Sequence, residues 1–253
     1  MSTVSQEANK IWQRFVVRPG ASVQGTFGIA SAHAIGGIID TILRQRPKTV
    51  LEIGAGIGTL TYTILRTATD LAPGNGRDLE LITIEKHPFC LEQLEKNLAC
   101  YEGRYRIEPD SGRLRSENRS FDFIVVDGGA GAEGRHHDGC DGGISGDMGV
   151  TDFSGMLNRG GSILVEGFRL FQRERIKEWY GDRDYVYMKS TPLSKRLTST
   201  DGRFVAKNNP YHIFHFEPTR GERFQLRLRH ETSQVVDRVR WRLSGLAHFG
   251  SDY

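Results

Sequence analysis

The sequence predicts an α/β fold: a seven-stranded, mostly parallel sheet with an antiparallel last strand and helices on both faces. Three observations lead to this fold class. Apolar, β-rich runs alternate with segments of helical spacing along most of the chain, as in parallel strands joined by crossover helices. The turns between them are short. The last β-rich run follows the sixth with no helical pattern in between, so we expect it to pair antiparallel.

The predicted strands are recognised by their apolar character and by the glycine, proline or aspartate residues that bound them. In chain order they are Thr49–Ile53, Leu79–Glu85, Arg104–Pro109, Phe121–Asp127, Gly160–Gly167, Asp184–Ser190 and Tyr211–Pro218. Helices are predicted at Ala30–Arg46, before Pro47, and at Thr59–Ala68, Pro88–Tyr101 and Phe171–Gly181. The polar stretch Thr191–Pro210 is predicted to be a loop.

The composition is that of a soluble globular protein, with 38% hydrophobic and 26% charged residues among 253. No run approaches about 18 apolar residues, so no membrane span is predicted, and the polar first residues predict no secretory signal. Cys90, Cys100 and Cys140 are few and odd in number, which favours free thiols in a reducing compartment. We therefore expect a cytoplasmic location.

The strongest motif is LEIGAGIG (Leu51–Gly58), in which a predicted strand runs into alternating glycines and then into a helix. Glycines permit positive φ and let the backbone approach a ligand closely. Such a turn lies at the carboxyl end of a strand, where open α/β sheets bind ligands. Nicotinamide and flavin proteins use related loops, but Thr59 stands where their fingerprint has its third glycine. A structural turn without a ligand is the other alternative.

From Lys48 to Glu217 the chain resembles the class I S-adenosylmethionine-dependent methyltransferases, which have a Rossmann-like fold. The resemblance rests on LEIGAGIG, on Glu85 ending the second strand, and on FDFIVVDGG and LNRGGSILVEGF at the fourth and fifth. It implies that Glu85 binds the ribose hydroxyls of the cofactor and that Asp110 faces its adenine. The implied cofactor-binding set is Glu52, Gly54, Ala55, Gly56, Gly58, Glu85, Lys86, Asp110 and Asp127. Alternatively, Glu85 is a solvated strand-end acid and Asp110 a turn residue.

The fourth-strand motif narrows the kind of methyltransferase. VDGG stands where amino-methylating enzymes carry an N/D-P-P-Y-like motif, and NNPY (Asn208–Tyr211) is interpreted as a turn into the last strand. The motifs are similar to those of small-molecule O-methyltransferases of the catechol, caffeoyl-coenzyme A and sugar-modifying kinds. That resemblance implies a Mg²⁺ site formed by Asp127, Asp152 and Glu166. The alternative is that Asp127 faces cofactor or substrate without metal and that Asp152 caps a helix.

A glycine-rich segment follows the fourth strand, with nine glycines from Gly128 to Gly149. Because this composition disfavours a helix, we interpret the segment as a mobile lid over the reaction site. His136 or His137 on the lid is a candidate catalytic base, beside Asp127 at the strand end. The alternatives are a solvated segment without a role, or a zinc site, although the spacing matches no standard zinc signature. The zinc ligands would be His136, His137, Cys140 and Asp141.

The predicted organisation has three parts: an N-terminal helical cap (residues 1–47), a cofactor-binding domain (48–217) and a basic extension (218–253). The cap holds a helix at about Val4–Val17 and is expected to cover the ligand entrance, as the resemblance implies. In the extension, Arg223–His230 alternates at period two, as in a strand, and valines and leucines at helical spacing follow. We interpret it as a strand-plus-helix appendage that packs on a neighbour or forms a homodimer.

Three function classes remain open. The leading one is a methyltransferase that methylates a hydroxyl of a small molecule by in-line transfer from S-adenosylmethionine. The second is an RNA or protein methyltransferase that docks its substrate through the extension, where seven arginines stand against four acids. The third is a cofactor-fold binding or regulatory protein without catalysis.

Overall fold

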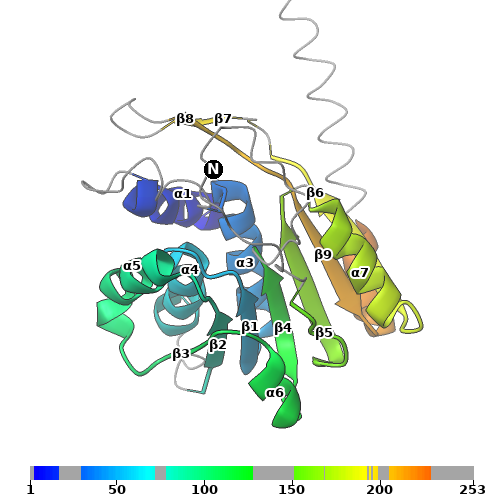
Figure 1. Cartoon of the computed structure of the whole chain (residues 1–253). Coiled ribbons are helices and arrows are strands. Elements are labelled where there is room, and N and C mark those ends of the chain that lie inside the picture. Colours follow the sequence, from blue (N-terminus) through cyan, green and yellow to red (C-terminus); the bar gives the residue numbers. More distant parts are fainter. Residues whose placement is uncertain are drawn as a thin grey trace, which may run out of the picture.

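The computed structural model describes residues 3–16, 30–71, 78–127, 151–167, 169–192, 194, 196–198 and 205–228. They form a seven-stranded sheet flanked by helices (Figure 1). Its strands are β1 (Thr49–Ile53), β2 (Glu80–Ile84), β3 (Arg106–Glu108), β4 (Phe121–Val126), β5 (Leu157–Glu166), β6 (Tyr185–Ser190) and β9 (Tyr211–Phe216). Their order across the sheet is β3-β2-β1-β4-β5-β9-β6.

The strand directions agree with the sequence-based prediction. The neighbours β3, β2, β1, β4 and β5 are all parallel, whereas β9 runs antiparallel between β5 and β6. The strand order reverses between β1 and β4, so the carboxyl ends of these two strands form the switch point where open α/β sheets bind ligands. The predicted fold class is therefore confirmed.

Each face of the sheet has its own helical layer (Figure 1). The α3 layer consists of α1 (Thr3–Val16), α3 (Ala32–Gln45), α4 (Thr59–Arg66) and α5 (Pro88–Leu98), and the α7 layer consists of α6 (Gly112–Ser116) and α7 (Leu170–Tyr180). Val50 packs with the α3 layer and its neighbour Leu51 with the α7 layer, because successive strand residues face opposite sides. In the described part of the chain, no helix is long and apolar enough to cross a membrane.

Short irregular turns of helix complete two of these elements. A π-helical turn, Thr67–Leu71, extends α4, and a 3₁₀ turn, Ala99–Tyr101, follows α5. The helix α3 begins at the cap Ser31, whose Oγ accepts a hydrogen bond from the Ala34 amide. It ends at Arg46, which takes the left-handed conformation just before Pro47.

Substitution of alanine for glycine is expected to have opposite effects on stability at two neighbouring positions of α3. A Cβ at Gly37 would lie 2.6 Å from the Tyr211 ring, whereas a Cβ at Gly36 would lie 3.7 Å from Ala8, an ordinary contact. Alanine gains up to about 1 kcal/mol of helix propensity over glycine at both positions. We expect Gly36→Ala to stabilise the protein by about 0.5–1 kcal/mol, and Gly37→Ala to destabilise it by about 1–2 kcal/mol through overpacking. Urea unfolding measures the change in unfolding free energy of each variant. Two changes of the same sign would contradict the packing of Gly37 against Tyr211.

One segment predicted to be a loop contains a small β-ribbon. Within Thr191–Pro210, β7 (Arg196–Thr198) pairs antiparallel with β8 (Val205–Lys207), apart from the main sheet. The loop prediction is wrong for these residues. Each strand is only three residues long and lies in a polar stretch, so no apolar alternation marked it in the sequence.

A second correction concerns the start of the C-terminal extension. The period-two alternation of Arg223–His230 predicted a strand, but residues 220–228 are helical. The helix is specified by a capping box. The Thr219 amide donates to Glu222 Oε2 over 2.8 Å, and the Glu222 amide donates to Thr219 Oγ1 over 3.3 Å. These local hydrogen bonds outweigh the alternation, which leaves Leu228 exposed and Leu226 buried.

Candidate active site

The glycine loop connects the carboxyl end of β1 to α4. Gly54, Gly56 and Gly58 have φ values of 85°, 54° and 91°, a region that side chains other than glycine rarely adopt. The Gly54 and Ala55 amides donate to the Ile84 carbonyl over 3.0 and 3.3 Å, which fixes the loop to the end of β2. A Cβ added at Gly56 would have no described atom within 4 Å. The backbone of the loop is therefore open to a ligand at Gly56.

Glu85 lies directly beside this loop. Its Oε2 accepts a hydrogen bond from the Gly56 amide over 2.8 Å, and its Oε1 accepts from the Lys86 and His87 amides, each over 2.9 Å. A carboxylate oxygen can accept about two hydrogen bonds, so Oε2 keeps acceptor capacity for a ligand hydroxyl. The carboxylate is thus held by three backbone amides and is not simply a solvated acid. Its binding to a ribose stays a prediction.

Glu52 occupies a different environment from the one expected of a ligand contact. Its side chain is fully buried in β1, where Oε2 accepts hydrogen bonds from Thr61 Oγ1 over 2.6 Å and from Thr83 Oγ1 over 2.9 Å. Within the described residues, Oε1 accepts no hydrogen bond. Burial raises the pKa of the carboxyl group to about 7. Glu52 therefore joins β1, β2 and α4 beneath the loop, and its contact with a cofactor stays a prediction.

Two carboxylates stand side by side where β4 and β5 end. Val126 and Val165 are register partners, so the next residues, Asp127 and Glu166, are neighbours on the α3 side of the sheet. Glu166 Oε1 accepts a weak hydrogen bond from the Ser31 amide over 3.4 Å. Burial, and then the Glu166 charge, raise the pKa of Asp127. Such a pair needs a positive charge nearby.

Arg169, just before α7, supplies that charge and was not predicted from the sequence. Its Nη2 donates to Asp127 Oδ1 over 2.9 Å and also to the Asp127 carbonyl. Its Nε donates to the Glu166 carbonyl over 3.0 Å. The guanidinium thus bridges the ends of the two strands. The only sequence signal was an arginine three residues after a strand-end acid.

The predicted metal ligands are not brought together. Asp152 lies on the α7 side of the sheet, where its carboxylate pairs with Arg115 and its carbonyl accepts from Ser111 Oγ over 2.8 Å. Asp127 and Glu166 lie on the α3 side. No three histidine, cysteine, aspartate or glutamate side chains of the described residues could hold a metal ion together. The Mg²⁺ site from Asp127, Asp152 and Glu166 is wrong for this structure, and we derive no step through a metal.

Two further candidates have partial or no structural description. Asp110 follows β3, and its Oδ1 accepts a hydrogen bond from the Gly112 amide over 2.7 Å, as in a turn that starts α6. That observation favours the turn interpretation, and adenine contact stays a prediction. His136 and His137 lie outside the described residues, together with the glycine-rich segment and its Cys140 and Asp141.

A comparison with models of known protein families and a search of curated proteins gave no match. Among solved structures, a proposed RNA methyltransferase from Pyrococcus horikoshii matches with a TM-score of 0.52 and 14% identity, over 85% of this chain and 96% of that one. A Podospora anserina methyltransferase with bound S-adenosylhomocysteine matches with a TM-score of 0.46 and 16% identity, over 86% and 89%. The Streptomyces achromogenes O-methyltransferase of tomaymycin synthesis, solved with S-adenosylmethionine, has a TM-score of 0.43 and 14% identity, over 86% and 91%. The chain has the fold of class I S-adenosylmethionine-dependent methyltransferases.

Proposed function

We propose that the protein is an S-adenosylmethionine-dependent methyltransferase. One observation carries the proposal: the carboxylate after β2 receives the amide of Gly56, in an open glycine loop at the switch point of this fold. A ribose that bound Glu85 would lie against the exposed backbone of the loop. When bound, the cofactor supplies an electrophilic methyl group on a sulfonium. The residues of this chain then have to align the acceptor and exclude water.

We infer that the acceptor is a hydroxyl of a small molecule. The acceptor side of the switch point carries the buried carboxylates of Asp127 and Glu166, with one arginine between their strand ends. Carboxylates accept hydrogen bonds from a neutral hydroxyl, whereas they repel the phosphates of a nucleic acid. RNA or protein methylation is the second candidate and depends on the arginines of the extension, most of which lie outside the described residues.

Calorimetric titration with S-adenosylhomocysteine tests the cofactor proposal. We expect binding with a dissociation constant of about 1–100 μM, in the range of ordinary enzyme–ligand affinities. Absence of binding by the pure folded protein would remove both methyltransferase candidates. Transfer of a tritiated methyl group then separates the acceptors. Label in a small phenol or sugar supports the first candidate, and label in total RNA or protein supports the second.

The Arg169–Asp127 pair predicts a non-additive double substitution. Arg169→Ala is expected to destabilise the protein by about 1–2 kcal/mol at pH 8, because it leaves the buried Asp127 carboxylate without its cation. Asp127→Asn in the Arg169→Ala background should recover at least half of that loss, because the stranded charge is gone. Denaturant unfolding of the two single variants and the double variant measures the coupling. Strict additivity would show that the pair has no energetic role.

A further inference from the structure

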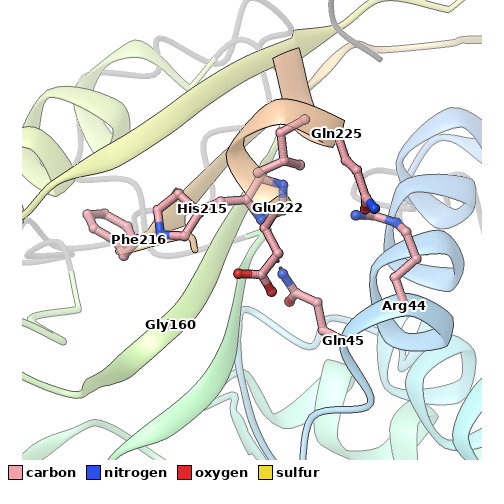
Figure 2. A pocket seen from close by; sticks show the side chains of 9 residues that line it. Arg44, Gln45, Gly160, His215, Phe216, Glu222 and Gln225 are labelled. Atoms are coloured by element: carbon pink, nitrogen blue, oxygen red, sulfur yellow. Dashed lines mark hydrogen bonds between the residues drawn. The ribbon is translucent and has the colours of Figure 1, made fainter. Parts of the chain in front are cut away.

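A pocket lies at the edge of the sheet opposite the glycine loop. It has a volume of about 390 Å³ and lies between the carboxyl end of α3, the strands β5 and β9, and helix 220–228 (Figure 2). Since β5 runs from Gly160 at this pocket to Glu166 at the switch point, the two sites are roughly 20 Å apart. Pockets of about 300–1,000 Å³ hold small molecules.

A buried polar cluster lies beside the pocket, and two of its members, Gln45 and His215, line the pocket. Ser162 on β5 and His215 on β9 are register partners, and Ser162 Oγ lies 2.8 Å from His215 Nδ1. Gln45 Nε2, at the end of α3, donates to Ser162 Oγ over 2.7 Å. On the same face, the neighbouring side chains Leu164 and Ile213 belong to the apolar core. Because these groups hydrogen-bond to one another, they hold the polar side chains of Gln45 and His215 in the wall of the pocket.

The walls of the pocket carry one charge of each sign. Arg44 of α3 is held by Asp40, one helical turn earlier, at 2.8 Å. Across the pocket, the Glu222 carboxylate accepts hydrogen bonds from the Thr219 amide over 2.8 Å and from Thr219 Oγ1 over 2.7 Å. These hydrogen bonds lower the pKa of Glu222, so that it is ionised at neutral pH. The Glu222 carboxylate is therefore held in position before a ligand arrives, whereas the Arg44–Asp40 pair is partly exposed.

Figure 2 shows that side chains from α3 and from helix 220–228 approach one another across the pocket. Gln45 and Gln225 offer amide donors and acceptors, and Leu226 offers a buried apolar surface. A phosphate would meet the Glu222 carboxylate, and a simple cation would meet the Arg44 guanidinium. A molecule that carries one negative and one positive charge could pair with Arg44 and with Glu222 at the same time.

We propose that this pocket binds a small zwitterion of the free amino-acid class. Its carboxylate faces Arg44, its ammonium group faces Glu222, and its side chain lies against Leu226. The site goes beyond the proposed methyl transfer, because it shares no residue with the glycine loop or with the strand ends at the switch point. A bound zwitterion would join helix 220–228 to α3, and it would raise the thermal stability by linkage.

The test uses the full-length protein and each of the twenty common L-amino acids in a thermal-shift screen, followed by calorimetry on those that stabilise. Inorganic phosphate and ethylammonium serve as probes with a single charge. We expect at least one amino acid to raise Tm by several degrees at about 100 times its dissociation constant, and neither single-charge probe to do so. Saturating adenosine, which carries no amino-acid group, should not compete, and this separates the pocket from the cofactor site.

Two substitutions localise the binding. Glu222→Gln should lower the affinity for the amino acid at least tenfold, since it removes a charged partner. Gln225→Ala should also lower the affinity while leaving the cap of the helix intact. The matched control is Glu92→Gln, a surface glutamate on α5 that pairs with Lys96. The proposal is overturned if no amino acid binds, if phosphate binds in its place, or if Glu222→Gln and Gln225→Ala leave the affinity unchanged.

Discussion

As the pH rises from 4.5 to 8, the free energy of unfolding of the Glu52→Gln variant is expected to increase by about 3 kcal/mol relative to that of the wild type. Glu52 is fully buried, and desolvation raises the pKa of its carboxyl group from 4.5 to about 7. At about 1.4 kcal/mol for each pH unit, that difference corresponds to about 3 kcal/mol. Glutamine has nearly the same shape and carries no charge at any pH.

The sign of this pH dependence follows from the number of protons bound by the folded and by the unfolded protein. Between pH 4.5 and about 7 the folded protein keeps the Glu52 proton and the unfolded chain releases it, so the free energy of unfolding falls as the pH rises. Above about pH 7 the folded protein carries the buried charge, and the loss is complete. The Glu52→Gln variant lacks this contribution, so its stability relative to the wild type should improve over the same interval.

Urea unfolding at half-unit pH steps measures the effect as the difference between variant and wild type. The matched control is Glu80→Gln at the start of the adjacent strand β2, where the side chain is 44% exposed. For that control, the difference in unfolding free energy from the wild type should not change between pH 4.5 and pH 8. A flat difference for Glu52→Gln as well would mean that the carboxyl group titrates as it does in water, and that the two threonine hydrogen bonds offset its burial.

A residue that costs stability at neutral pH invites a functional explanation. Glu52 lies on β1, two residues before Gly54 of the glycine loop, and its carboxylate accepts a hydrogen bond from Thr61 in the first turn of α4. Proteins often keep strained or desolvated groups where a ligand binds. If Glu52→Gln both stabilises the protein and weakens S-adenosylhomocysteine, the carboxyl group serves the cofactor; if it only stabilises, Glu52 is a structural group.

The sequence predicted those features that depend on strand ends. The strand β1 was predicted with both its boundaries, because an apolar run between Pro47 and Gly54 has unambiguous limits. Since parallel strands place their carboxyl ends at one edge, the sequence predicts Glu85 and the glycine loop as neighbours. In the structure, the Gly56 amide nitrogen lies 2.8 Å from Glu85 Oε2.

Features that depend on long side chains and on competing local signals could not be predicted in this way. Arg169 reaches back to two strand ends, and nothing in its spacing distinguishes it from a solvated arginine. The metal prediction failed because sequence order does not tell on which face of the sheet Asp152 lies. Ser162 and His215 looked like ordinary strand residues, and only their register makes them partners.

Replacing Glu85 by alanine should weaken S-adenosylhomocysteine binding more than tenfold. The substitution removes the carboxylate that would accept the ribose hydroxyls, and hydrogen bonds to a charged group contribute about 1.5–3 kcal/mol each. It also releases the Gly56, Lys86 and His87 amides, which the carboxylate holds at 2.8–2.9 Å and which fix the shape of the loop. Both effects act in the same direction.

A series at the same position separates the two effects. Glu85→Gln keeps one acceptor oxygen, which can still receive the Gly56 amide, but has no charge to offer a ribose; we expect affinity between those of the wild type and of Glu85→Ala. The control is Glu80→Ala at the other end of β2, where the carboxylate pairs with Arg119 far from the loop. Calorimetry should find wild-type affinity for that control. If Glu85→Ala also retained wild-type affinity, the ribose would have to bind elsewhere, and the hydrogen bonds of Glu85 would serve only to hold the turn between β2 and α5.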